Sequence, residues 1–281
     1  HRPKVIIYFM TNGTYASCTG FVNCKHSKNI NLLGIKEITM FQLHSYLLVL
    51  HILLGCIALV LFWVPVFTAK GQLNHKKFGK YYTNTMYSVA ATGAIMAIMV
   101  LIAPLYFKQH IAPNADPENL ATSVRTFWWF LLYLAVLSYV GTKHGFEVLK
   151  VRENRHLLKR VTYVLPVAVL LLGGIVLFVS GVSRSHVLHS IFGILGTLVA
   201  LGTFKYIYAK SVSKNRYITE HIGSMIGSAI GAYTAFLAFG GRTLLEGIGS
   251  YQIIFWIAPG VIGSAASYIL CKKYAKVFAI Q

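Results

Sequence analysis

Seven long apolar runs, separated by short polar links, make up most of the chain from residue 40 onward. A membrane-spanning helix needs about 20 mostly apolar residues, and each run reaches that length. The first run, from Tyr46 to Trp63, contains no Asp, Glu, Lys or Arg. Strands of a membrane barrel would show alternating segments of about ten residues instead. The pattern therefore predicts seven transmembrane helices, near 45–68, 81–107, 122–144, 160–181, 186–208, 218–239 and 251–271.

The composition agrees with this pattern and excludes an ordinary soluble protein. The 281 residues are 56% hydrophobic and only 12% charged, and the mean hydropathy is +0.62. A soluble domain usually carries about 25% charged residues, which is twice the fraction found here. The short links leave no room for a soluble domain. We therefore expect an all-α polytopic membrane protein whose core lies within the lipid bilayer.

The basic residues indicate the orientation of these helices. The net charge is +19, from 26 Lys and Arg against 7 Asp and Glu. Most basic residues after residue 39 lie in alternate links and in the C-terminal tail: Lys70, Lys76, Lys77, Lys80, Lys143, Lys150, Arg152, Arg155, Lys159, Arg160, Lys205, Lys210, Lys214, Arg216, Lys272, Lys273 and Lys276. The opposite side holds Lys108, Arg125, Arg184 and Arg242. By the positive-inside rule, the first helix starts outside and the C-terminus lies in the cytoplasm. The basicity thus reflects topology, and no nucleic-acid partner is expected.

Residues 1–39 differ from the rest of the chain. They begin with His, carry five basic residues, and lack the charged start, apolar centre and cleavage site of a signal peptide. Met40 stands just before the first apolar run, and codons for Lys36-Glu37 can form a ribosome-binding sequence upstream of it. We expect residues 1–39 to be a non-native leader or a disordered extension, and 40–281 to be the transmembrane domain. The alternative is a genuine extracytoplasmic extension.

The four cysteines give no sign of a disulfide framework or a zinc site. Cys18 and Cys24 fall in the first segment, and Cys56 and Cys271 fall in the first and last predicted helices. No Cys-x-x-Cys motif occurs. We expect these residues to be small and buried.

Four histidines recur in a pattern that suggests a weak internal repeat. His51 lies early in the first helix and His189 early in the fifth, whereas His75 and His221 stand at the entrances to the second and sixth. The first and fifth helices run inward, so His51 and His189 are expected near the outer face. Because 24 residues of helix span about 36 Å, His75 belongs to the opposite, cytoplasmic face, as does His221. The topology therefore predicts two histidine pairs, one near each face.

Facing imidazoles are the axial ligands of a bis-histidine haem. Gly55, Gly79 and Gly193 each follow one of these histidines by four residues. Residues four apart share a helix face, so these glycines leave space for a flat porphyrin beside the ligand. We expect haem b, with the iron bound by His51, His75, His189 and His221. The predicted function is electron transfer across the membrane, with a redox partner or a quinone.

Other interpretations stay open at this point. Small residues four apart also pack membrane helices closely, and histidines at span ends can be structural or interfacial. The pairs can instead bind another metal or a quinone, and His44, His144 and His186 are further candidates near span ends. If the histidines are structural, the chain is a non-redox membrane protein, such as a small-solute permease, a sensor or an assembly partner. None of the acids Asp116, Glu118, Glu147, Glu153, Glu220 and Glu246 lies near mid-span, which disfavours a proton pump.

One stretch of motifs resembles a known family. His51-x-x-x-Gly55, Lys70-Gly71, the run from His75 to Tyr82, and Met86 are similar to the front of the DUF2306 family. These are bacterial multi-pass membrane proteins with a domain of unknown function. The later half is similar through Arg216-Tyr-Ile-Thr-Glu-His221 and Tyr233-Thr-Ala-Phe236. The likeness covers about residues 45–240, and it implies a multi-pass fold in the bacterial cytoplasmic membrane but no activity. The histidine layout is also similar, by analogy, to cytochrome b561-type proteins, which hold two haems between helix pairs.

Overall fold

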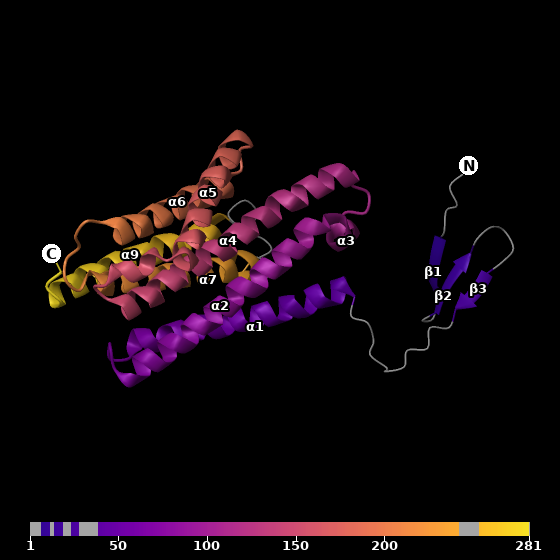
Figure 1. The fold of residues 1–281 in the computed structure, drawn as a ribbon. Helices are drawn as coiled ribbons and strands as arrows, with labels where there is room; N and C mark the ends of the chain where they lie inside the picture. The colour runs from indigo at the N-terminus through magenta and orange to yellow at the C-terminus, as the bar shows by residue number, and fades with distance from the viewer. Residues whose placement is uncertain (1–6, 12–13, 19–23, 28–38, 242–252, 281) are drawn as a thin grey trace. The chain divides into compact units, whose positions relative to one another are not determined.

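The computed structural model describes residues 7–11, 14–18, 24–27, 39–241 and 253–280 (Figure 1). It divides into two units, His1–Met40 and Phe41–Gln281. In the first unit, β1 (Ile7–Thr11), β2 (Thr14–Cys18) and β3 (Cys24–Ser27) form an antiparallel sheet in that order. Ile7 pairs with Cys18, and Cys18 with Cys24, in the backbone register. The prediction that residues 1–39 are a leader or extension stays a prediction.

The second unit is all-α and confirms the predicted fold class. Seven of its described helices are long and apolar enough to cross a membrane. They are α1 (Met40–Phe67), α2 (Leu73–Ile102), α4 (Pro117–Val151), α5 (Val161–Ser183), α6 (Val187–Tyr208), α7 (Arg216–Ala235) and α9 (Ile253–Val277). A π-helix, η3 (Phe236–Gly241), continues α7. The chain is therefore an integral membrane protein of the multi-pass type.

The second predicted helix differs from the observed one at both ends. α2 already begins at Leu73, and it ends at Ile102 rather than at residue 107. Pro104 explains the end, because proline disfavours a helical conformation in the residue before it. A short helix, α3 (Pro104–Lys108), and a turn of 3-10 helix, η1 (Gln109–Ile111), follow. A second 3-10 helix, η2 (Arg155–Lys159), lies between α4 and α5.

Helix α4 is longer than predicted, because its N-terminus is capped ahead of the apolar run. Asp116 accepts a hydrogen bond from the backbone N–H of Asn119 at 2.9 Å, and Pro117 occupies the first helical position. Both residues are typical of a helix start.

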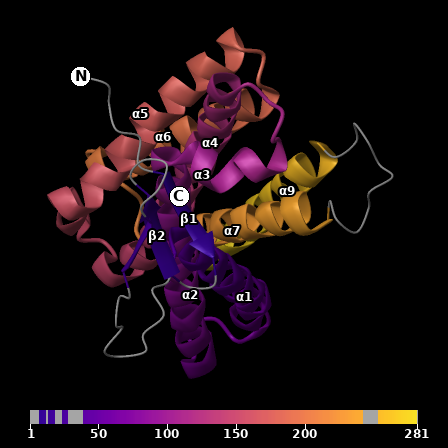
Figure 2. The same cartoon turned by 90° about the vertical axis from the view of Figure 1, so that its right-hand side faces the viewer.

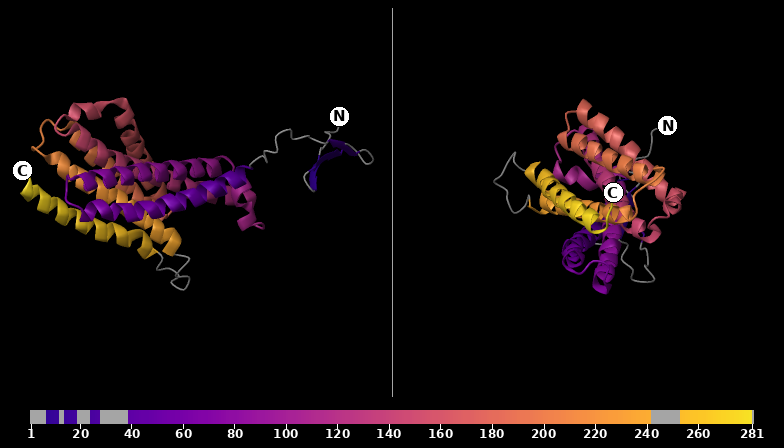
Figure 3. Two further views of the ribbon diagram at one scale, coloured as in Figure 1. Left: turned by 90° about the horizontal axis from the view of Figure 1, so that it is seen from below. Right: turned by 90° about the vertical axis from the view of Figure 1, so that its left-hand side faces the viewer.

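The helices pack in neighbouring pairs around α4. α5 and α6 lie side by side, as do α7 and α9, while α4 contacts α2 and α7 (Figures 2 and 3). Gly181 and Gly193 bring α5 and α6 together, because a Cβ at either position would lie 2.5–2.6 Å from a backbone nitrogen of the other helix. The largest buried cluster comes from α4, α5 and α6 and includes Phe130, Tyr163 and Leu170.

Much of the remaining apolar surface faces outward, as expected of helices that contact lipid. Val60, Leu172 and Ile262 are all mostly exposed. Cys56 is exposed on α1 and Cys271 is half-buried on α9, so the expectation that both are buried was wrong. The side chains of Cys18 and Cys24, together with Arg242 and Glu246, lie outside the described residues.

One end of the bundle carries most of the positive charge. The α1–α2, α4–α5 and α6–α7 links and the end of α9 lie there, and the basic residues that the sequence grouped together lie in these links and in the helix turns beside them. We call this the basic end. Its assignment to the cytoplasm, and the internal repeat, stay predictions.

Candidate functional site

One of the two predicted histidine pairs comes together at the basic end. His75 lies in the first turn of α2, and His221 lies in the second turn of α7. Their ring centroids are 6.3 Å apart, and the ring planes meet at 74°. Both side chains are half-buried. The pair therefore joins two helices that are far apart in the sequence.

The short link after α1 positions His75. Gly71 has a φ of +78°, a left-handed conformation that glycine adopts without steric cost. The last four carbonyls of a helix have no partner inside that helix. One of them, the oxygen of Pro65 in α1, accepts a hydrogen bond from His75 Nδ1 at 3.0 Å and one from Lys70 Nζ at 2.9 Å. The His75 ring is thus held against the end of α1.

A close approach of α4 and α7 positions His221. Its Nδ1 donates a hydrogen bond of 2.7 Å to the backbone oxygen of Gly145 in α4. A Cβ at position 145 would lie 2.7 Å from Met225 Sδ and 3.2 Å from Ser224 Cβ. Glycine at this position therefore allows the two helices to come this near, and it brings the His221 ring to the α4 backbone.

These two hydrogen bonds define the tautomer of each ring. A carbonyl oxygen only accepts, so Nδ1 carries the proton in both histidines and Nε2 keeps a lone pair. Within the described residues, neither Nε2 makes a hydrogen bond. Histidines that bind metal usually donate their other N–H to a carbonyl or carboxylate in this way. Metal–imidazole bonds are about 2 Å long, so one metal ion fits between rings whose centroids are 6.3 Å apart.

The pair consists of two histidines beside an open helix face. No group of three or more His, Cys, Asp or Glu gathers among the described residues, so the pair has no third ligand of these types there. Gly79 lies one turn after His75 on the same helix face, and a Cβ there would meet nothing within 4 Å. Packing therefore does not require glycine at this position. The face of α2 beside His75 is open, as a flat macrocycle needs.

The other two predicted ligands lie against different neighbours. His51 Nδ1 is 2.9 Å from Thr92 Oγ1 on α2, and the small Gly93 leaves room for the ring. His189 is buried, and its ring packs edge-on against Phe130 and close to His186, each with centroids 5.1 Å apart. Neither ring nitrogen of His189 has a hydrogen-bond partner in the described structure. No ring contact joins His51 to His189 among the described residues.

A second group of ionisable side chains was not predicted as a unit. His144 of α4 is buried and bonds through Nδ1 to the hydroxyl of Tyr163 on α5. Its Nε2 is 3.4 Å from a carboxylate oxygen of Glu220 on α7, and the other oxygen of Glu220 accepts from Arg216 Nε at 3.0 Å. The ring of Tyr206 on α6 meets His144 edge-on at 5.6 Å. This network links four helices, and the only sequence signal for it was a histidine near a span end.

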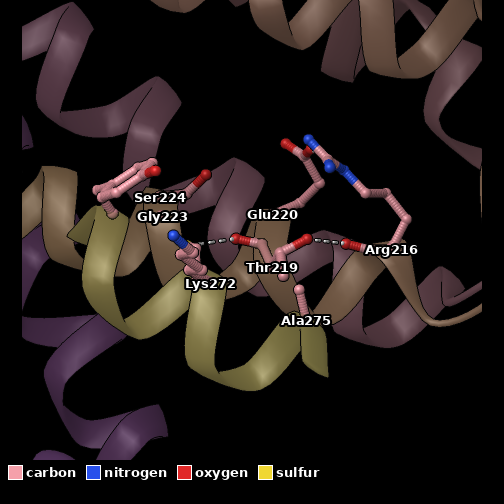
Figure 4. Close-up of a pocket in the computed structure, with 9 residues that line it drawn as sticks. Arg216, Thr219, Glu220, Gly223, Ser224, Lys272 and Ala275 are labelled. Atoms are coloured by element: carbon pink, nitrogen blue, oxygen red, sulfur yellow. Dashed lines mark hydrogen bonds and ion pairs between the residues drawn. The ribbon is translucent and has the colours of Figure 1, made fainter. Parts of the chain in front are cut away.

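A groove lies beside this network, between the start of α7 and the last turns of α9 (Figure 4). Its volume is about 510 Å³. It is lined by Arg216, Thr219, Glu220, Gly223, Ser224, Tyr268, Cys271, Lys272 and Ala275. We call it the α7–α9 groove.

Comparison with known proteins gives no match: no protein-family model, no curated protein and no solved structure matches this chain.

Proposed function

We propose that this integral membrane protein binds one haem b through His75 and His221 and carries electrons at the basic end of the bundle. The observation that supports this proposal is the geometry of the pair. The ring centroids of two imidazoles, one on α2 and one on α7, lie 6.3 Å apart, and each Nδ1 donates to a backbone carbonyl. The pair therefore presents two Nε2 lone pairs, and Gly79 leaves the adjacent helix face open.

Two backbone carbonyls of the chain would support haem binding at this site. A bound haem supplies one-electron redox chemistry. The Pro65 and Gly145 carbonyls orient the two rings and increase the basicity of each Nε2. The ends of α1 and α4 thereby fix both imidazoles before the cofactor binds, which lowers the ordering cost of binding. A redox partner or a quinone would accept or supply the electron.

Location and family belong to the same proposal. The positive-inside rule supports an orientation with the basic end in the cytoplasm, and the family resemblance supports a bacterial cytoplasmic membrane. The motifs from His51 to Met86 and from Arg216 to Phe236 support membership of the DUF2306 family. A second haem between His51 and His189 stays a prediction without a supporting contact in the described residues.

A non-redox membrane protein is the second candidate, and it has its own supporting observation. The ring nitrogens of His144 and one nitrogen of His51 are hydrogen-bonded to protein side chains, as in structural histidines. A permease, sensor or assembly partner would need nothing more from these residues. The same experiment distinguishes the two candidates.

The test is an absorption spectrum of the detergent-purified protein, oxidised and then reduced with dithionite, after expression with ample haem. The proposal predicts a Soret band that shifts on reduction. His75→Ala and His221→Ala should each remove most of the band, because each removes one axial ligand. His156→Ala is the matched control, since His156 is exposed at the same end of the bundle.

Two outcomes would overturn the proposal. A purified wild-type protein without a Soret band would favour the non-redox candidate. A full band in both His75→Ala and His221→Ala would show that the ligands are elsewhere.

A further inference from the structure

We propose that the α7–α9 groove is a binding site for an acidic phospholipid, whose phosphate lies between Arg216 and Lys272. This inference does not depend on haem binding. It follows from the shape, the charge and the position of the groove, which Figure 4 shows with side chains from both helices.

Small side chains produce the hollow. Gly223 on α7 faces Ser267 and Cys271 on α9 at about van der Waals distance, since a Cβ at 223 would lie 3.9–4.0 Å from them. Ala275 continues this lining toward the end of α9. The Cys271 thiol donates to the backbone oxygen of Thr219 at 3.6 Å, which holds the two helices together beside the groove.

The charged groups of the groove favour an anion. Arg216 uses its Nε to bind Glu220 at 3.0 Å, and within the described residues its two terminal nitrogens form no side-chain hydrogen bond or ion pair. The second oxygen of Glu220 lies 3.4 Å from His144 Nε2, and the ion-pair partner of this carboxylate in the groove is Arg216. Lys272 lies over the ring of Tyr268 at 5.8 Å and forms no ion pair within the described residues. The lining therefore carries Arg216 and Lys272 against Glu220, which leaves one net positive charge, and Lys272 is the cation without an ion pair in the described structure.

The position of the groove favours a lipid over a soluble anion. No residue of α9 is buried in the described structure, and both Tyr268 and Ile269 are mostly exposed. The groove is therefore open on the outer side of α9, where apolar side chains lie next to it. It also lies at the basic end, where Lys273 and Lys276 follow on α9. Acidic headgroups are attracted to such positions by about 1 kcal/mol per Lys or Arg.

The test measures phosphatidylglycerol bound to the full-length protein. The protein is placed in nanodiscs of phosphatidylcholine with a small fraction of phosphatidylglycerol, and the retained lipid is counted by native mass spectrometry. Lys272→Gln should reduce the retained phosphatidylglycerol about fivefold, which corresponds to the loss of one cation near the headgroup. Lys276→Gln is the matched control, because it removes the same charge one turn further along α9 and outside the groove lining.

A second variant tests the groove itself without a change of charge. Ala275→Leu fills the space and should reduce phosphatidylglycerol binding, while the melting temperature in detergent stays at the wild-type level. Equal losses in Lys272→Gln and Lys276→Gln would show general surface attraction and overturn the site. Full retention in Ala275→Leu would also overturn it. Inorganic phosphate alone should leave the melting temperature unchanged; stabilisation by phosphate equal to that by the lipid would identify a soluble anion instead.

Discussion

The sequence predicts a histidine pair at each end of the bundle, but the contacts of the histidines differ between the two ends. At the basic end, His75 and His221 lie ring to ring, and backbone carbonyls fix both. At the other end, His51 bonds to Thr92, while His189 packs against Phe130. The helices explain this contrast. α7 contacts α4 and reaches α1 through Tyr233, whose hydroxyl donates to the backbone oxygen of Leu59, whereas α6 packs mainly on α5. Depth in the membrane alone therefore does not pair two residues.

The glycines that follow these histidines differ in their packing but do not divide by end of the bundle, because a Cβ at Gly55, four residues after His51, also meets nothing within 4 Å. An added Cβ at Gly193, four residues after His189, would lie 2.6 Å from the backbone nitrogen of Phe178. Gly79, four residues after His75, has open space in the same test. One sequence pattern, His-x-x-x-Gly, thus has two physical causes. Helix packing explains it on α6, and space beside a ligand is our explanation on α2.

The largest effect, on haem absorbance, is expected from variants that remove one histidine pair at a time. A His75→Ala, His221→Ala double variant should lose nearly all haem absorbance, because no axial ligand remains at the proposed site. A His51→Ala, His189→Ala double variant should keep it, because these rings contact other side chains. Absorbance at the Soret maximum per mole of protein is the measurement. A band lost equally in both double variants would remove the difference between the two ends.

A smaller effect is expected when alanine replaces each glycine. Gly193→Ala should destabilise the protein by about 1–3 kcal/mol, because the added methyl group meets backbone that cannot move aside. Gly79→Ala should leave stability unchanged or increase it by up to about 1 kcal/mol, since alanine is the better helix former. Thermal unfolding in detergent, followed by circular dichroism, measures both changes.

A bulkier residue separates stability from binding at position 79. Gly79→Leu should fold as the wild type does and yet bind several-fold less haem, because its side chain occupies the open face beside His75. Equal destabilisation by Gly79→Ala and Gly193→Ala would show that both glycines serve packing alone.

The smallest effect is expected at the partner of His51. Thr92→Val keeps the shape of the side chain but removes the hydroxyl that meets His51 Nδ1. Polar contacts between membrane helices contribute about 0.6 kcal/mol on average, so the melting temperature should fall by only a few degrees. The absorption spectrum should not change. A loss of absorbance in Thr92→Val would mean that the other end also takes part in cofactor binding.

The sequence allowed prediction of the helices and of one residue pair, and the reasons are physical. Each span is long and apolar, so hydropathy located all seven. The ends were less accurate, because Asp116 and Pro104 determine them through capping and backbone restriction rather than through hydrophobicity. The approach of His75 and His221 was predictable because each lies near the start of a helix, and both helices begin at the same end of the bundle.

The rest of the site depends on which helices are neighbours, and hydropathy carries no such information. His144, Tyr163 and Glu220 come from three separate helices, so their hydrogen bonds emerge only from the packing. The contact of His221 with α4 likewise depends on Gly145, which looked like one small residue among many in the sequence.

The haem content of the purified wild-type protein tests the central claim most directly. Extraction of the haem as its pyridine complex gives the amount of haem, and amino-acid analysis gives the amount of protein. We expect one haem per chain, because one of the two predicted histidine pairs lies ring to ring among the described residues. A ratio of zero would contradict the proposed site, and a ratio of two would show that His51 and His189 also bind a haem.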